Sequence, residues 1–102
     1  MLSKKDILAR KAKLIKVDFD GDCIYIKEFT SKVREQFIKA ETFAEQQLIT
    51  ILNCLCDEAG KPVFTEEDIE DIEALSADYL DELFLAISEA TKQKDGKEVA
   101  GN

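Results

Sequence analysis

The feature that most constrains the fold is an Asp-Gly pair between two β-prone runs near the N-terminus. The runs cover residues 14–19 and 23–27, and Asp20, Gly21 and Asp22 lie between them. Glycine adopts a positive φ at no steric cost, so such a pair favours a tight hairpin turn. Because a lone hairpin is only marginally stable in water, we expect its apolar face to pack on helices. Its two edges are expected to be free, and therefore open to strands from another copy.

The Asp-rich turn also resembles the start of a calcium-binding loop. Counted from Asp18, an EF-hand loop requires Gly at its sixth position and Glu at its twelfth. This chain has Cys23 and Phe29 at those positions, and the flanking runs are predicted strands rather than helices. We therefore interpret these residues as a turn and not as a cation site.

Helical periodicity follows the hairpin. Apolar residues recur at steps of three or four over residues 33–55, which is typical of one face of a helix. Thr30 or Ser31 can cap the start of this segment. Thr42, with Glu45 three residues later, matches a second helix start, so the pattern fits either one long helix or two.

Two further helices are predicted downstream. Thr65 caps a short acidic helix that extends to about Ala74, and Ser76 caps a final helix. The fold class is therefore α+β and mostly α-helical, with an N-terminal β-hairpin packed against a bundle of about four helices. The buried stripe of the final helix is predicted to consist of Leu80, Leu83, Phe84 and Ile87.

The two ends of the chain have few apolar anchors. Ser3 can cap a helix that extends to about Lys13, but its thin apolar side predicts a mobile segment over residues 1–13. Residues 92–102 are polar, contain Gly and show no periodicity, so we expect a disordered tail there. Residues 1–91 are then expected to form a single domain.

Charge is unevenly distributed along the chain. The 102 residues carry a net charge of −8, with +4 on residues 1–40 and −12 on residues 41–102. An acidic chain lacks the basic footprint on which phosphate binding depends, so we expect no nucleic-acid partner. The basic front and acidic back suit head-to-tail contact between copies, or a partner of mixed charge. The alternative is a solvated surface that keeps the domain soluble.

The three cysteines are Cys23, Cys54 and Cys56. An odd number without an apolar leader segment is typical of a reducing cytosolic compartment rather than of a secreted disulfide scaffold. Zinc requires about four ligands, and thiols two residues apart on a helix point away from each other. We therefore expect Cys54 and Cys56 to be buried structural thiols. No apolar run approaches the ~20 residues that span a bilayer, so we expect no membrane partner.

The sequence offers no catalytic constellation. It contains no His, the commonest general base, and no Gly-rich phosphate loop. We therefore expect no enzymatic activity, no catalytic residue, no cofactor and no bound metal. The basic N-terminal segment leaves an alternative of a different class, a small cytosolic adaptor or regulator that contacts nucleic acid. The residues that would make this contact are Lys4, Lys5, Arg10, Lys11, Lys13 and Lys16.

The order of elements resembles a known family. Residues 55–68 combine a helix end, an acidic turn with Gly60-Lys61-Pro62, and an aromatic-Thr pair before acidic residues. This segment is similar to one in the tail assembly chaperones of long-tailed, siphovirus-type bacteriophages. Residues 72–84 look like the closing helices of that family, and residues 23–37 resemble its strand, Thr and helix. The resemblance covers residues 14–91.

The resemblance implies a non-structural phage protein that acts in the host cell cytoplasm and is absent from the mature virion. Members of this family coat the long helical tape measure protein and bring tail tube subunits to it during tail morphogenesis. The expected partners are therefore the tape measure protein, the major tail tube protein and other copies of the chain. We expect the copies to associate head to tail as a homo-oligomer.

A long amphipathic helix such as a tape measure would bind in an apolar slot between helices. Apolar positions outside the predicted helical stripes are candidates for this contact, with core packing as the alternative for each. These candidate protein-contact residues are Ile38, Phe43, Ile49 and Leu85.

Overall fold

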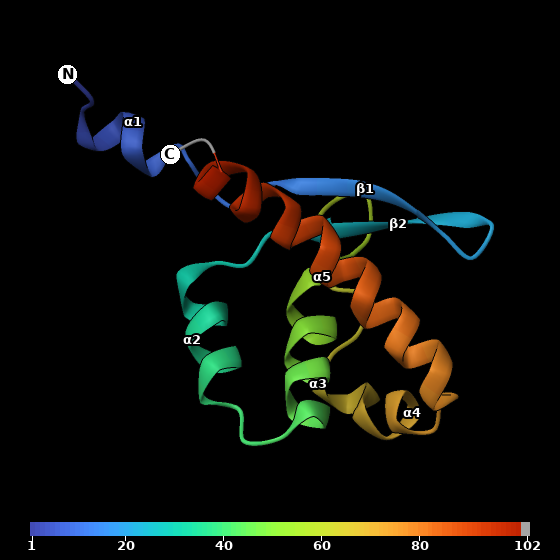
Figure 1. The fold of residues 1–102 in the computed structure, drawn as a ribbon. Helices are drawn as coiled ribbons and strands as arrows, with labels where there is room; N and C mark the ends of the chain where they lie inside the picture. The colour runs from blue at the N-terminus through green and yellow to red at the C-terminus, as the bar shows by residue number, and fades with distance from the viewer. Residues whose placement is uncertain (101–102) are drawn as a thin grey trace.

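The computed structural model describes the backbone of residues 1–100 and the side chains of residues 1–91. A small antiparallel sheet lies behind the last helix, and the helices between residues 31 and 73 lie below the sheet in the view of Figure 1. This arrangement confirms the predicted α+β class with an N-terminal hairpin. The elements in chain order are α1 (Lys4–Leu8), β1 (Leu14–Phe19), β2 (Asp22–Lys27), α2 (Ser31–Lys39), α3 (Phe43–Cys54), β3 (Leu55–Cys56), the 3-10 turn η1 (Glu66–Asp68), α4 (Ile69–Glu73) and α5 (Ala77–Ala100).

β1 and β2 form the predicted hairpin. Phe19 pairs with Asp22 across a two-residue turn, in which Asp20 has a φ of 53° and Gly21 a φ of 75°. Two positive φ values define a type I′ turn, whose twist matches that of the flanking strands. The resulting register points Val17 and Phe19 to one face, where both pack against the core.

The outer edge of β2 is not free, contrary to the expectation for an isolated hairpin. The helix that was predicted to include Leu55 and Cys56 ends at Cys54, and these two residues form β3. They pair with Ile26 and Tyr25 of β2. Leu55 is 6% exposed and Cys56 4% exposed, so burial beside β2 outweighs continuation of the helix. In the strand order β1-β2-β3, β1 keeps the open edge of the sheet.

Residues 31–54 form two helices rather than one. The Thr30 hydroxyl accepts a hydrogen bond from the Val33 backbone N–H at 3.2 Å, and Thr42 accepts one from Glu45 at 3.1 Å. Both predicted caps are therefore used, and Ala40 between the helices is extended. The capping chemistry at Thr42 starts a new helix although the apolar periodicity continues through it.

α1 is shorter than the sequence predicts. Ser3 caps it as expected, because its hydroxyl accepts from the Asp6 N–H at 3.1 Å and its own N–H donates to the Asp6 carboxylate at 3.0 Å. The second of these bonds lowers the pKa of Asp6. The helix ends at Leu8 and not near Lys13, because none of its residues is buried and a short helix without packing is marginal in water. The mobility of residues 1–13 stays a prediction.

The core lies between β2, α3, α4 and α5. The predicted stripe of α5 contributes Leu83 and Ile87, which are buried, and Leu80, which packs against the core. Thr65 and Ser76 begin η1 and α5 as predicted; the Asp68 carboxylate accepts from the Thr65 N–H at 2.8 Å. The buried members of the core are Ile26, Ile51, Cys54, Leu55, Ile72, Leu83 and Ile87.

α5 extends further than its apolar stripe. Its backbone is helical to Ala100, where the sequence pattern favours an irregular polar tail over residues 92–102. Lys, Gln, Glu and Ala have good helix propensity and prolong an existing helix at little cost, even without an apolar face. Residues 101–102 of that predicted tail lie outside the described residues. The division into a domain of residues 1–91 and a tail stays a prediction.

Candidate partner-binding surfaces

The four predicted contact residues lie on three helices that pack in succession, α2 against α3 and α3 against α5. Ile38 on α2 is 71% exposed, Phe43 at the start of α3 is 57% exposed, and Leu85 on α5 is 56% exposed. Ile49 is half-buried in α3. Three large apolar side chains therefore face solvent, and burial of the part of each that is still exposed would gain roughly 1–2 kcal/mol.

Phe43 meets α5 beside Leu85. The ring of Phe43 lies 5.3 Å from the ring of Phe84 at an interplanar angle of 86°, which is an edge-to-face contact. Leu85 follows Phe84 along α5 and faces solvent. We refer to Phe43, Phe84 and Leu85 as the apolar helical surface. The sequence predicted two of these residues but assigned Phe84 to the buried stripe, whereas it is only half-buried.

Carboxylates border the apolar helical surface. Asp81, Glu82 and Glu89 each lie three or four residues from Leu85 on α5, and are therefore its neighbours on the helix. The carboxylate of Asp81 accepts from the buried Gln47 side-chain amide at 2.7 Å, which fixes α5 on α3. An apolar centre with an acidic rim fits an amphipathic helix whose polar positions are basic.

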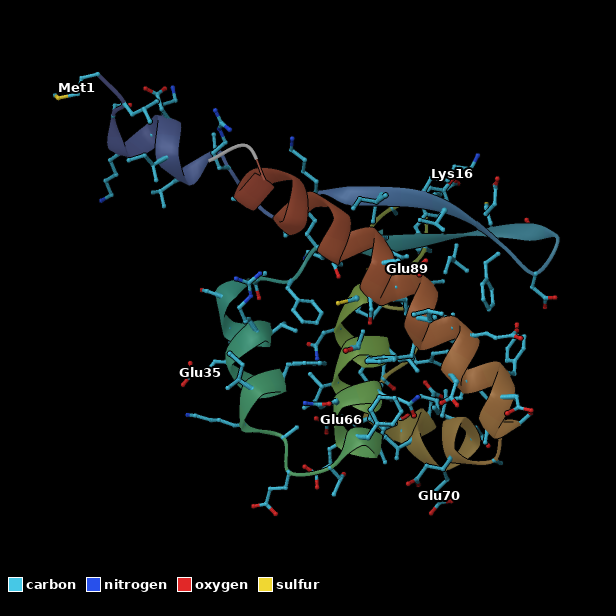
Figure 2. The ribbon with its side chains drawn as sticks, viewed as in Figure 1. Met1, Lys16, Glu35, Glu66, Glu70 and Glu89 are labelled. Atoms are coloured by element: carbon cyan, nitrogen blue, oxygen red, sulfur yellow. The ribbon has the colours of Figure 1, made fainter. Side chains whose placement is uncertain are left out.

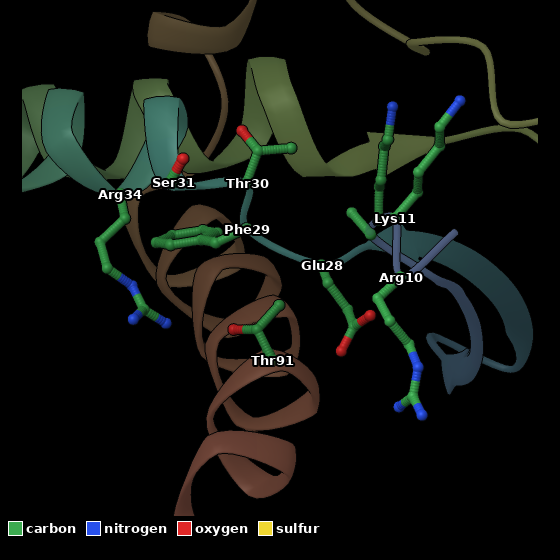
Figure 3. A pocket seen from close by; sticks show the side chains of 10 residues that line it. Arg10, Lys11, Glu28, Phe29, Thr30, Ser31, Arg34 and Thr91 are labelled. Carbon is green, nitrogen blue, oxygen red and sulfur yellow. The ribbon is translucent and has the colours of Figure 1, made fainter. Parts of the chain in front are cut away.

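A second candidate is a pocket of about 560 Å³ where the α1–β1 linker, the β2–α2 linker and α5 meet (Figure 3). Its volume falls within the ~300–1,000 Å³ range of ligand pockets. We refer to it as the basic pocket, because its lining includes Arg10, Lys11, Lys27 and Arg34, and Glu28 is the one acidic residue among the lining residues that the structure describes. The remaining lining residues are Ala12, Phe29, Thr30, Ser31 and Thr91.

The register of the β1–β2 hairpin brings the residues that line the basic pocket together. Leu14 pairs with Lys27, and the pairing continues past the strands because the Glu28 N–H donates to the Lys13 carbonyl at 3.0 Å. The Glu28 carboxylate in turn accepts from the Lys13 N–H at 2.7 Å. These bonds hold residues 10–13 beside residues 28–31, so cations that are distant in the sequence line one cavity.

The sequence pattern did not identify this pocket. The basic N-terminal segment includes Arg10 and Lys11, but it does not include Lys27 or Arg34. Figure 3 shows Arg34 on the opposite side of the pocket from Arg10 and Lys11. The signal that joins them is the hairpin register itself, since a turn at Asp20-Gly21 necessarily brings the residues before β1 beside those after β2.

Acidic residues gather at the other end of the molecule. Residues 66–73 carry exposed carboxylates on η1 and α4, which we refer to as the acidic segment. In Figure 2, Glu66 and Glu70 lie in the lower half of the view, whereas α1 and the beginnings of β1 and α2, beside which the basic pocket lies, are higher in it. The charge asymmetry of the sequence is therefore also an asymmetry in space.

Over the side chains of residues 1–91, no group of three or more His, Cys, Asp or Glu is arranged so that it could hold a metal ion. No helix in the described part of the chain has both the length and the apolar character needed to cross a membrane.

Comparison with known proteins identifies the family. Neither the curated proteins nor the solved structures contain a match to the chain. The family described as phage tail assembly chaperone, TAC, matches residues 3–91. This match confirms the resemblance of residues 14–91, and it includes the basic pocket, the acidic segment and the apolar helical surface. The chain therefore belongs to the phage tail assembly chaperone family.

Proposed function

We propose that this chaperone coats the tape measure protein of its phage, keeps it extended and brings major tail tube subunits to it. It acts as a binding protein without catalysis, works in the host cell cytoplasm and is absent from the mature virion. Family membership supports the general role in tail assembly. The single observation that carries the specific role is the apolar helical surface with its acidic rim.

The apolar helical surface has the chemistry that an amphipathic helix requires. Phe43 and Leu85 are more than half exposed on two helices in contact. Burial of the exposed part of these two side chains yields roughly 1 kcal/mol or more each, and every 1.4 kcal/mol is a tenfold change in affinity. The rim of Asp81, Glu82 and Glu89 would favour tape measure segments that carry Lys or Arg beside their apolar stripe.

Coating a long filament requires many copies, and we propose that the copies associate head to tail. The basic pocket and the acidic segment lie at opposite ends of the chain's fold, which supports this arrangement (Figure 2). A heterologous contact of this kind leaves one free surface at each end, so it extends into rings or spirals instead of stopping at a dimer.

Co-expression with a fragment of the tape measure protein from the same phage genome tests the proposal. We expect the fragment to aggregate when it is expressed alone. With the chaperone it should enter the soluble fraction and co-purify with it. If the chaperone neither co-purifies with the fragment nor improves its solubility, coating of the tape measure is excluded as its role.

A further inference from the structure

The basic pocket has no part in the proposed contact with the tape measure. We propose that it binds the acidic segment, residues 66–73, of a second copy of this chain. The inference rests on the proposed head-to-tail association and names the two surfaces that make it.

The basic pocket holds an excess of positive charge. Among the described residues that line it, four are cationic (Arg10, Lys11, Lys27 and Arg34) and one, Glu28, is acidic. That carboxylate already accepts a backbone N–H bond from residue 13 at 2.7 Å. Charge-assisted bonds to carboxylates are about twice as strong as neutral ones, and the planar guanidinium of Arg binds a carboxylate through two parallel bonds.

The polar groups of the pocket wall have partners within the fold. The Thr30 hydroxyl accepts from Val33, and the Thr91 hydroxyl donates to the carbonyl of Ile87 at 3.2 Å. The ring of Phe29 packs against Phe37 with centroids 5.5 Å apart, which fixes this part of the pocket wall. We assign recognition of an anionic ligand to the cationic side chains of Arg10, Lys11 and Lys27, which line the pocket.

The acidic segment is the part of this chain that fits such a pocket. Residues 66–73 contain six acidic residues and no basic one. Ile72 anchors the segment in its own core at 1% exposure, and Asp68 bonds to Thr65 at 2.8 Å. The remaining carboxylates are exposed on a helical backbone, so their binding costs side-chain entropy but little additional backbone entropy.

The placement of the two surfaces excludes contact within one copy. The linkers whose residues line the basic pocket and the helix α4 of the acidic segment lie at opposite ends of the fold (Figure 1). Each copy must therefore use its pocket with one neighbour and its acidic segment with another. The apolar helical surface lies on α3 and α5 and takes part in neither contact. It stays open to a tape measure helix while the copies are joined.

Sedimentation velocity with charge-reversal variants tests the contact. We expect the wild type to associate at about 0.05 M salt and to dissociate at about 1 M, where the screening length falls to ~3 Å. Arg10→Glu/Lys11→Glu and Glu66→Lys/Glu67→Lys alter exposed residues outside the core. Each variant alone should associate at least ~10-fold more weakly. An equimolar mixture of the two should associate again, because each altered surface then meets its complement.

A control separates the pocket from net charge. Lys16→Glu/Lys61→Glu makes the same change in charge at exposed lysines outside the pocket, and it should associate like the wild type. The pocket contact is overturned if the Arg10→Glu/Lys11→Glu variant associates as strongly as the wild type. It is also overturned if the control variant associates as weakly as the Arg10→Glu/Lys11→Glu variant. Salt-sensitive binding of duplex DNA that Arg10 and Lys11 support while self-association is unchanged overturns it as well.

These outcomes are distinct from failure of the proposed function. A wild type that stays monomeric at high concentration and low salt overturns head-to-tail association as a whole. The co-expression test with the tape measure fragment is read separately. A monomeric Arg10→Glu/Lys11→Glu variant should still bind the fragment through Phe43 and Leu85.

Discussion

Thr50 buries a hydroxyl that has no hydrogen-bond partner among the described residues. Its side chain is fully buried in α3, and an unsatisfied buried polar group costs ~1–3 kcal/mol. Thr50→Val replaces the hydroxyl with a methyl group of nearly the same shape. We expect the free energy of unfolding, measured by urea denaturation, to rise by about 1 kcal/mol.

Thr50→Ser is the matched control, because it keeps the hydroxyl and removes the methyl group. It should lower the free energy of unfolding by about 1 kcal/mol through the cavity it leaves. If Thr50→Val destabilises the protein as much as Thr50→Ser does, the hydroxyl contributes to stability and this account of the residue is wrong.

Burial of Cys54 makes the stability of the fold depend on pH in the alkaline range. Burial raises the pKa of its thiol to about 12, and the neighbouring Cys56 adds to the shift. The folded chain therefore keeps this proton at pH values where the unfolded chain, with an ordinary thiol pKa of ~8.5, has lost it. The stabilisation is complete below pH ~8.5 and is lost as the pH rises towards the folded-state value.

Cys54→Ala should reveal this linkage under reducing conditions. At pH 8 the variant should be less stable than the wild type, because it leaves a cavity. At pH 10 the difference between the two proteins should shrink by about 2 kcal/mol, since one pKa unit corresponds to ~1.4 kcal/mol. Urea denaturation at both pH values measures the difference in the free energy of unfolding between the two proteins. The same difference at pH 8 and pH 10 would contradict the raised pKa of Cys54.

At the scale of elements, the hairpin depends on the type I′ turn. Gly21 has a φ of 75°, and a Cβ added there would meet no atom within 4 Å, so the cost of Gly21→Ala is conformational and not steric crowding. We expect the free energy of unfolding to fall by ~1–2 kcal/mol. The transition midpoint in urea measures this change.

Cys23 permits a direct control for this prediction. Ligation at the bond before Cys23 can introduce D-alanine at position 21, and a D-residue adopts a positive φ without strain. The D-alanine protein should be at least as stable as the wild type. Equal losses with L- and D-alanine would show that the methyl group, and not the turn conformation, is responsible.

Local chemistry made several elements predictable from the sequence. The Asp20-Gly21 turn and the caps at Ser3, Thr30 and Thr42 depend on residues within three positions of one another. Elements that depend on distant partners were not predictable. β3 exists because β2 lies beside it, and α1 ends early because nothing buries its apolar side.

The candidate surfaces also combine residues that local sequence predicts with residues that only distant contacts identify. Phe43 and Leu85 stand outside the apolar periodicity, so the sequence predicted them as contact candidates. Phe84 fits the periodicity of α5, and only the packing of α3 shows that it meets Phe43. The basic pocket needs the hairpin register to join Arg10 to Lys27 and Arg34, which composition alone does not supply.

At the scale of the whole molecule, the charged surfaces and the apolar helical surface occupy different elements. The basic pocket and the acidic segment lie at opposite ends of the fold, and the apolar helical surface lies on α3 and α5. Exposed ion pairs contribute only ~0.2–1 kcal/mol each and are screened by salt. Under the proposed function, copies joined in this way would separate readily when tube subunits replace them on the tape measure.

Under the proposed function, the apolar helical surface binds the tape measure helix. Phe43→Glu/Leu85→Glu changes two side chains that are more than half exposed, and Val63→Glu changes an apolar side chain, 49% exposed, outside the helices. Fluorescence anisotropy with a labelled tape measure fragment measures the affinity of each protein. We expect the double variant to bind at least ~10-fold more weakly than the wild type, and the Val63 variant to bind like the wild type. Wild-type affinity in a folded double variant would contradict the claim.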